Sequence, residues 1–318
     1  MTGKMTISVF LKLVEIQTKL ASLFPFLIGV LFSMVYFKAF NLGNTLIFFV
    51  GMLLFDMTTT AINNFMDYKK AKNDTYKYET NIVGQAGLAE AQVSQLIFTM
   101  LGLSAVIGGL LVYKTGWLML IMGGLCCFIG VFYTFGPVPL SRMPLGEIFS
   151  GVTMGLGIFM MTIYVNAYDL KFLFLDIQNW QFMIYGDLKL LLAIGWASLP
   201  MVFTIANIML ANNLCDLEED IANHRYTLPF YIGKANGVKL FNSLMYGCYA
   251  VSLIGVLFNV YHWSMLIVFG TLPLVHKNLS VFNQEQVKSR TFAISLKNLV
   301  IFNTAQIIGL LLSLLLTK

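Results

Sequence analysis

The chain has 318 residues, of which 58% are hydrophobic and only 11% are charged. Soluble domains carry about 25% charged residues, so this composition leaves too little polar surface to cover a soluble globule of this size. The chain is therefore an integral membrane protein, and disordered, collagen-like and disulfide-scaffold classes are excluded. The net charge is +5 and no basic block is interleaved with aromatic residues, so we expect no nucleic-acid partner.

Nine apolar runs are long enough to cross the hydrocarbon core of a bilayer as helices, which takes about 20 residues. They lie at about 20–38, 45–66, 91–113, 116–135, 147–168, 190–214, 238–260, 262–281 and 293–316. Their density predicts an all-α, polytopic membrane protein with nine transmembrane helices in one bundle. A transmembrane barrel would instead show short strands of alternating hydrophobicity.

The basic residues predict the orientation of this bundle. If the N-terminus is cytoplasmic, most of the 20 Lys and Arg residues fall on the cytoplasmic side. The outer side keeps only Lys38, Lys114, Lys171, Lys189 and Lys318. This bias predicts a multi-pass protein of the cell membrane, with a cytoplasmic N-terminus. The longest outer connection, 169–189, is rich in aromatic residues and is expected to lie at the membrane interface.

The acidic residues are concentrated in two clusters. Eight of the 15 lie within 56–79 and 216–220: Asp56, Asp67, Asp74, Glu79, Asp216, Glu218, Glu219 and Asp220. In the first cluster Asn63 and Asp67 are four residues apart and share a helix face, with Asp56 on the same stripe. In the second cluster Asn212, Asp216 and Asp220 repeat at the same spacing, so in a helix they stack along one face.

Both clusters close an apolar run, and the third to sixth predicted helices lie between them. Four crossings return the chain to the same side, so we expect both clusters at the cytoplasmic mouth of the bundle. This pattern predicts a single domain, 1–318, with an internal repeat of two four-helix halves, about 20–135 and 147–281, plus a ninth helix. One cluster alone fits a solvated loop equally well, but two on one side indicate function, because acids at the membrane edge are costly.

Carboxylate and amide oxygens at this spacing are hard ligands that suit Mg²⁺, which commonly bridges a few carboxylates to the phosphates of a substrate. Two facing sets are therefore predicted to hold a diphosphate through Mg²⁺, while nearby cations neutralise the remaining phosphate charge. The available cations are Lys19, Lys69, Lys70, Lys72, Arg142 and Arg225.

At these residues the sequence resembles the UbiA superfamily of intramembrane aromatic prenyltransferases, whose hallmark is two Asp-rich motifs ending the second and sixth of nine helices. Residues 63–74 resemble the first motif and residues 212–220 the second. The branch that it resembles most is dihydroxynaphthoate polyprenyltransferase. The similarity lies in the long spacing from Asp67 to Asp74, in YTFGPVPLSRMPLGE from Tyr133, and in NNLCDLEEDIANHRYTLP from Asn212.

The resemblance implies a UbiA-like bundle and an enzyme, an aromatic prenyltransferase with Mg²⁺ as cofactor. Its substrates would be a polyprenyl diphosphate and an aromatic acid, and it would work within the lipid bilayer. For this branch the acceptor is dihydroxynaphthoate, decarboxylated during menaquinone biosynthesis. Physically, a prenyl cation needs a dry, apolar tunnel that excludes water. The alternatives are another ring, such as hydroxybenzoate or haem, and a cation-coupled transporter, although transporters usually bind substrate at the midplane.

The resemblance also assigns roles to the clustered residues. Asn63, Asp67 and Asp74 are expected to hold one Mg²⁺. Asp216 and Asp220 are expected to hold another, with Asn212 as an orienting ligand. Asp67 and Asp216, at the centres of the two sets, are the expected catalytic carboxylates.

Diphosphate binding is expected from Lys19, Lys72 and Arg225. Lys19 stands where many superfamily members have an Arg-Pro pair, and each of the three cations also fits an ordinary membrane anchor. Arg142 is expected to bind the carboxylate of the acceptor. Tyr133 could face the prenyl cation with its ring or simply pack in the bundle. Asp56 would act as a catalytic base behind the metal ligands or pair inside the bundle.

Overall fold

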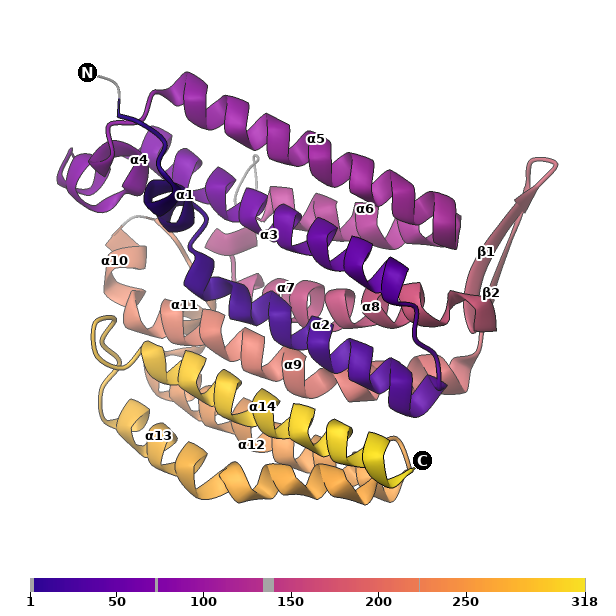
Figure 1. Cartoon of the computed structure of the whole chain (residues 1–318). Helices are drawn as coiled ribbons and strands as arrows, with labels where there is room; N and C mark the ends of the chain where they lie inside the picture. Colours follow the sequence, from indigo (N-terminus) through magenta and orange to yellow (C-terminus); the bar gives the residue numbers. More distant parts are fainter. Residues whose placement is uncertain (1–2, 72–73, 134–139, 223, 318) are drawn as a thin grey trace.

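Long helices make up nearly all of the described chain. The computed structural model describes residues 3–71, 74–133, 140–222 and 224–317. The helices form an elongated bundle, and a two-stranded hairpin projects from one of its ends (Figure 1). The chain starts at one end of the bundle and finishes at the opposite end (Figure 1), as expected for an odd number of crossings.

The first part of the chain forms six α-helices: α1 (Ile7–Leu13), α2 (Leu20–Phe32), α3 (Leu42–Lys70), α4 (Ile82–Gln85), α5 (Glu90–Thr115) and α6 (Trp117–Phe132). The second part forms eight: α7 (Gly146–Ser150), α8 (Ile158–Ala167), α9 (Leu188–Cys215), α10 (Leu217–Ala222), α11 (Leu228–Ile232), α12 (Lys234–Leu257), α13 (Leu272–Gln284) and α14 (Ala293–Leu316). Shorter 3₁₀ segments, including Ile16–Lys19 and Trp263–Thr271, and π-helical segments, including Ser33–Phe37 and Gly151–Gly157, extend these helices.

Eight described helical segments are long and apolar enough to cross a membrane. They are Ile16–Phe37, Leu42–Lys70, Glu90–Thr115, Gly146–Leu170, Leu188–Cys215, Lys234–Leu257, Trp263–Gln284 and Ala293–Leu316. The remaining predicted run, 116–135, corresponds to α6, whose 16 residues extend about 24 Å. The all-α, multi-pass prediction is confirmed, with eight full-length spans and one shorter apolar helix in the described ranges.

The connection 169–189 holds the one sheet in the described part of the chain. Strands β1 (Leu173–Gln178) and β2 (Gln181–Gly186) pair antiparallel, with Leu173 opposite Gly186. The two turn residues between them, Asn179 and Trp180, have φ of 50° and 63°, the left-handed geometry that closes a two-residue hairpin. These strands are not predicted from the sequence, because LFLDIQ lacks the alternation typical of a half-buried strand.

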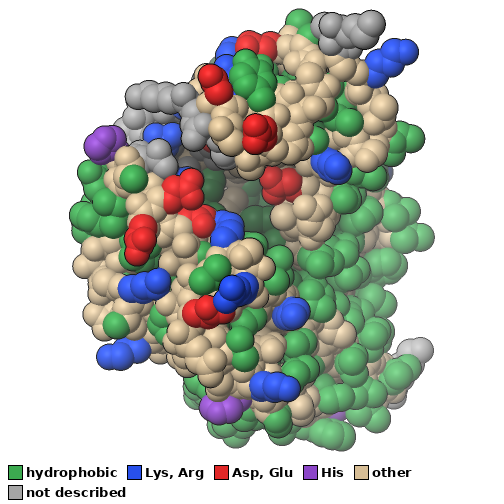
Figure 2. All heavy atoms as spheres, turned by 90° about the vertical axis from the view of Figure 1, so that its left-hand side faces the viewer, with side chains coloured by type: hydrophobic (Ala, Val, Ile, Leu, Met, Phe, Trp, Pro, Cys, Tyr) green, Lys and Arg blue, Asp and Glu red, His purple; other side chains and the backbone are tan. Residues whose placement is uncertain are grey.

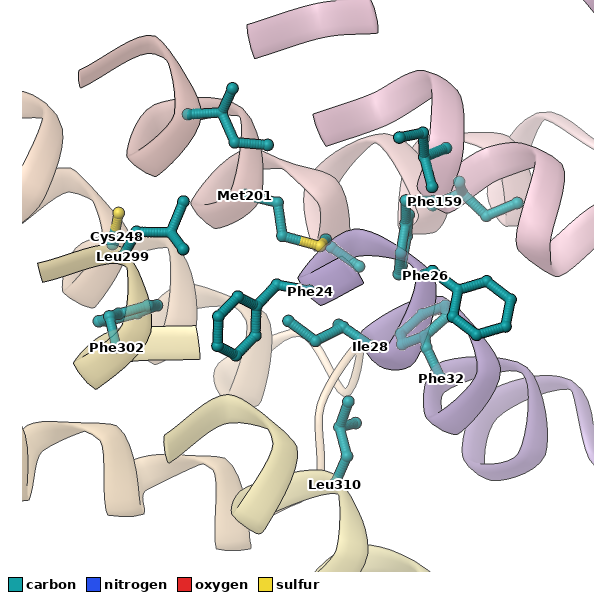
Figure 3. Packing of buried hydrophobic residues seen from close by; sticks show 14 of the residues in the cluster. Phe24, Phe26, Ile28, Phe32, Phe159, Met201, Cys248, Leu299, Phe302 and Leu310 are labelled. Atoms are coloured by element: carbon teal, nitrogen blue, oxygen red, sulfur yellow. The ribbon is translucent and has the colours of Figure 1, made fainter. Parts of the chain in front are cut away.

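The main core surrounds α2. Phe24, Phe26, Ile28 and Phe32 of α2 are buried among side chains of α8, α9 and α14 (Figure 3). The ring centroids of Phe32 and Phe159 are 5.4 Å apart. In lipid the surroundings are as apolar as these side chains, so close packing rather than the hydrophobic effect stabilises such contacts.

Small residues allow this close packing. A Cβ atom at Gly155 would lie 2.6 Å from the backbone nitrogen of Val202 on α9, and one at Gly29 would lie 2.8 Å from Thr162 on α8. Real Cβ contacts do not reach such distances, so glycine at these two positions permits the helices to approach.

The fold brings both acidic clusters to one end of the bundle. Helices α3 and α9 both end there, beside α10 and the 285–292 loop that joins α13 to α14 (Figure 1). Seen from this end, charged side chains surround a hollow, whereas the flanks are largely hydrophobic (Figure 2). A smaller core, which includes Leu13, Ala61, Phe65 and Val93, packs α3 against the N-terminal segment and α5.

Candidate active site

A cavity of about 790 Å³ lies between α3, α5, α6 and the Gly151–Gly157 segment. Residues 48 to 63 of α3 contribute to its lining, which corresponds to about 22 Å of helix. The polar side chains that line it include Lys19, Asp56 and Asn63; Asp56 lies at the middle of α3, and Asn63 lies about two turns nearer the end that carries the first cluster. Most of the remaining lining is apolar or glycine. The cavity thus joins a polar mouth to an apolar interior.

The first cluster lies where α3 approaches this mouth. Asn63 lines the cavity, and Asp67, one turn further along the helix, is exposed to solvent. The helix ends at Lys70, and Ala71 is extended with ψ of 125°. This is the helix break that the seven-residue spacing from Asp67 to Asp74 requires, and Asp74 is exposed beyond it.

The second cluster spans the junction of α9 and α10. Asn212 lies in the last turn of α9, Asp216 follows the helix end at Cys215, and Asp220 lies on α10. Helix α9 thus ends within one residue of the predicted run 190–214, and the three residues do not share one uninterrupted helix. Helical hydrogen bonds nevertheless connect the three residues: Asp216 N donates to Asn212 O at 3.0 Å, and Asp220 N donates to Asp216 O at 2.8 Å.

Two cations bind this second cluster. The Lys288 ammonium donates to Asp216 Oδ2 at 2.5 Å and also to Asn212 Oδ1. The guanidinium of Arg225 lies 3.4 Å from Asp220 Oδ1. The sequence analysis treated Lys288 only as one of many cytoplasmic cations, because nothing in the local sequence connects it with Asp216, 72 residues earlier.

Arginine side chains also connect the two clusters. Arg225 and Arg142 are both close enough to Asp67 to interact with its charge. Since Arg225 also pairs with Asp220, its guanidinium lies near carboxylates of both clusters. Asp220 is only 4% exposed, and burial raises the pKa of its carboxyl while the charge of Arg225 lowers it.

Lys19 and Asp56 form a buried pair at the polar end of the cavity. The Lys19 ammonium donates to Asp56 Oδ1 at 2.7 Å, to Asp56 O at 3.2 Å and to Thr60 Oγ1 at 2.6 Å. Ser22 Oγ donates to the other carboxylate oxygen of Asp56 at 2.6 Å. An ammonium has three N–H groups, so this arrangement leaves Lys19 none for a diphosphate. Of the two roles expected for Asp56, the structure shows the internal pair.

A second buried carboxylate lies behind the second cluster. Glu147 is 3% exposed, and its Oε1 accepts a hydrogen bond of 2.8 Å from Asn213, the neighbour of Asn212. Tyr133 lines the cavity and donates from its hydroxyl to Gly146 O at 3.3 Å. The Leu-Gly-Glu sequence at 145–147, part of the segment that resembles the family, thus binds the hydroxyl of Tyr133 through Gly146 and the side chain of Asn213 through Glu147.

The described residues could hold a cation through their oxygen atoms, and that cation would also bind the phosphates of a substrate. No group of three or more His, Cys, Asp or Glu within the described ranges could hold a metal ion by itself. However, the Lys288 ammonium shows that oxygens of Asn212 and Asp216 converge on one cation. Mg²⁺ commonly takes one or two carboxylates and completes its shell with phosphate and water. The remaining predicted diphosphate ligand, Lys72, lies outside the described residues.

Comparison with known proteins agrees with this geometry. The family model described as the UbiA prenyltransferase family matches residues 22–301. A curated relative, 1,4-dihydroxy-2-naphthoate octaprenyltransferase of Bacillus subtilis (strain 168), is 26% identical over 232 residues, which cover 70% of this chain. The aligned region spans 66% of that relative, just under two thirds of its length.

Two solved structures share the fold. A UbiA homolog from Aeropyrum pernix K1 superposes with a TM-score of 0.68 at 15% identity, covering 91% of this chain and 97% of that one. A UbiA homolog from Archaeoglobus fulgidus, bound to GPP and Mg²⁺, gives a TM-score of 0.62 at 12% identity, covering 96% and 99%. At sequence identities this low, the structural similarity shows a shared fold.

Proposed function

Because the chain belongs to the UbiA prenyltransferase family, we propose that it transfers a polyprenyl group from a polyprenyl diphosphate to an aromatic acceptor in a Mg²⁺-dependent reaction. The observation that carries this proposal is that Asn63 of the first cluster lines an apolar cavity, while Arg225 lies near both Asp67 of that cluster and Asp220 of the second. The diphosphate would bind at the mouth and the prenyl chain in the cavity.

The residues at the mouth match the charge of a diphosphate leaving group. Asn63 and Asp67 lie on α3, Asn212 lies in the last turn of α9, and Asp216 follows directly after that helix. These oxygens would hold Mg²⁺, which would supply positive charge against the negative charge that develops on the diphosphate as the allylic C–O bond breaks. Arg225, between the clusters, is the described cation best placed to bind the phosphates directly.

The cavity would protect the prenyl cation from water. Its interior includes Phe48, Met52 and Phe55 along α3, together with glycines of α5 and α6. A dry apolar wall leaves the acceptor ring as the available nucleophile. The Tyr133 ring lines the cavity, where its π face could stabilise the cation.

We propose 1,4-dihydroxy-2-naphthoate as the acceptor. The support is the relative from Bacillus subtilis and the branch-like sequences around 133–147 and 212–229. The allylic C–O bond breaks with its electron pair on the diphosphate, and a C–C bond forms at the ring carbon that carries the carboxylate. Loss of carbon dioxide then returns the C–C bonding pair to the ring and restores its aromaticity. Arg142, exposed at the mouth, would orient the carboxylate before it leaves.

The test is an acceptor panel with mass detection of products. Purified full-length protein in detergent receives Mg²⁺, a polyprenyl diphosphate, and either dihydroxynaphthoate or hydroxybenzoate. We expect a prenylated naphthalenediol that is lighter than the simple adduct by one carbon dioxide. A hydroxybenzoate product that keeps its carboxylate, with dihydroxynaphthoate ignored, would leave the family assignment intact and contradict this acceptor.

A further inference from the structure

The ammonium of Lys288 lies where two side-chain oxygens of the second cluster come together. It belongs to the 285–292 loop between α13 and α14, and its ammonium binds both Asn212 Oδ1 and Asp216 Oδ2. Its side chain is 47% exposed, so the bridge lies at the rim of the mouth rather than within the bundle. This cation therefore occupies the place at which a metal ion would meet the same two oxygens.

The loop backbone holds Lys288 in this place. Val287 N donates to Thr291 Oγ1 at 2.9 Å, and Thr291 N donates to Val287 O at 2.8 Å, which closes a turn around Lys288. Thr291 itself is only 2% exposed. The backbone position of Lys288 is thus fixed by a buried residue, while its long, flexible side chain keeps its head group at the solvent boundary.

Lys19 differs from Lys288 in both its burial and its hydrogen bonds. Its side chain is 7% exposed, and its three hydrogen bonds to Asp56 and Thr60 use all of its N–H groups. The bridge formed by Lys288 uses two N–H groups and reaches solvent. Half-exposed ion pairs contribute little to stability, so the Lys288 ammonium can leave its partners at small cost, whereas that of Lys19 cannot.

We propose that Lys288 is a diphosphate-binding residue that also occupies the second cluster until substrate arrives. A metal ion and an ammonium cannot share the oxygens of Asn212 and Asp216, because like charges at such distances repel. The displaced ammonium needs only a side-chain rotation to reach the phosphates of a substrate bound there, where it forms a charge-assisted hydrogen bond. Metal and diphosphate therefore bind together. This inference rests on the proposed function.

The experiment measures binding rather than turnover. Full-length wild type, Lys288→Met and the loop control Arg290→Gln are purified in detergent. Arg290 pairs with Glu285 in the same loop, with an exposed side chain. Mn²⁺ binding is followed by electron paramagnetic resonance without and with inorganic pyrophosphate. Without pyrophosphate, Lys288→Met should bind Mn²⁺ about threefold more tightly, because a competing cation is gone.

With Mn²⁺ present, Lys288→Met should bind pyrophosphate about tenfold more weakly, because one charge-assisted hydrogen bond is lost. Lys288→Arg should recover most of this loss, and Arg290→Gln should match wild type in both measurements. Changes of opposite sign distinguish this role from a structural one, since a disordered loop would weaken both affinities.

Unchanged pyrophosphate binding in Lys288→Met, while Asp216→Asn loses Mn²⁺, would overturn the role of Lys288 and leave the proposed function standing. Parallel weakening of both affinities in Lys288→Met would also overturn it. A wild-type protein that binds no Mn²⁺ even with pyrophosphate would overturn this inference and the proposed function together.

Discussion

The two acidic clusters meet at one mouth but differ in their surroundings. In the second cluster Asp216 and Asp220 are paired with Lys288 and Arg225. In the first, Asp67 is exposed and makes no salt bridge to any residue that the structure describes. The difference indicates that ion pairs hold the carboxylates of the second cluster in place, whereas Asp67 of the first cluster, although near Arg225 and Arg142, forms no ion pair within the described part of the chain and is accessible to a ligand.

The helices near the two clusters also differ in how much of their surface is buried. In α5, which packs beside α3, 17% of the most apolar stretch is buried, against 44% in α9. The cavity lies on the loosely packed side, between α3, α5 and α6. The bundle therefore combines a closely packed half that positions charge with an open half that leaves room for a long apolar chain.

Metal removal should have the largest effect, because each of the two clusters is expected to hold a Mg²⁺ ion. Exhaustive chelation with EDTA should abolish product formation, and Mg²⁺ or Mn²⁺ should restore it. Zn²⁺ should not, because Asn and Asp oxygens are hard ligands and neither cluster contains a His within its motif. Prenyl transfer is measured by mass spectrometry of the product, and full activity after chelation would refute the assignment.

Substituting the central carboxylate of either cluster should have the next largest effect. Asp67→Asn and Asp216→Asn should each lower kcat at least about a hundredfold, since each removes charge stabilisation at the leaving group. Expression and thermal unfolding should stay near wild type for Asp67→Asn, whose side chain is exposed.

Glu218→Gln is the matched control for this pair, because Glu218 belongs to the second acidic cluster but is exposed and has no expected role in binding metal or diphosphate. Its kcat should remain near that of wild type. Turnover within a few-fold of wild type in either aspartate variant, at limiting Mg²⁺, would contradict the two-cluster site.

The buried pair below the mouth should be more important for folding than the pairs at the mouth. Lys19→Met leaves the Asp56 carboxylate, 14% exposed, without its counter-ion. Removing one partner of a buried pair costs about 3 kcal/mol, whereas an exposed pair contributes about 1 kcal/mol or less. Denaturant unfolding in detergent should therefore show a much larger loss of stability for Lys19→Met than for Lys288→Met. Equal losses of stability in the two variants would contradict the larger structural role assigned to Lys19.

The smallest expected effect is on donor length. Gly109 of α5 lines the cavity with open space at its Cβ position, and Gly102 on the same helix has the same open space but does not line the cavity. Gly109→Phe should lower kcat/KM for a long polyprenyl diphosphate about tenfold relative to geranyl diphosphate, since the ring narrows the cavity. Gly102→Phe is the control, and an equal effect of both variants would show that the prenyl chain binds elsewhere.

The sequence by itself determined the helices and the ends at which the clusters lie. Apolar runs of helical length are a local signal, because a chain in lipid must satisfy its backbone hydrogen bonds within each helix. The four-residue spacing of Asn63 and Asp67, and the parity of the crossings before Asn212, predicted two sets of oxygen-bearing side chains at one end of the bundle, and both clusters lie at that end in the structure (Figure 1). The two strands at 173–186 were missed, because their sequence lacks the alternation of a half-buried strand.

Only the tertiary structure decided which cation meets which carboxylate. The sequence offered Lys19 as a diphosphate ligand, but the packing of α2 against α3 commits it to Asp56. Conversely, Lys288 meets Asp216 across 72 residues of chain, and Glu147 meets Asn213 across 66. Such pairings depend on how loops and helix ends are placed by the whole bundle. Helical periodicity constrains neighbours within a few turns and says nothing about partners on another helix.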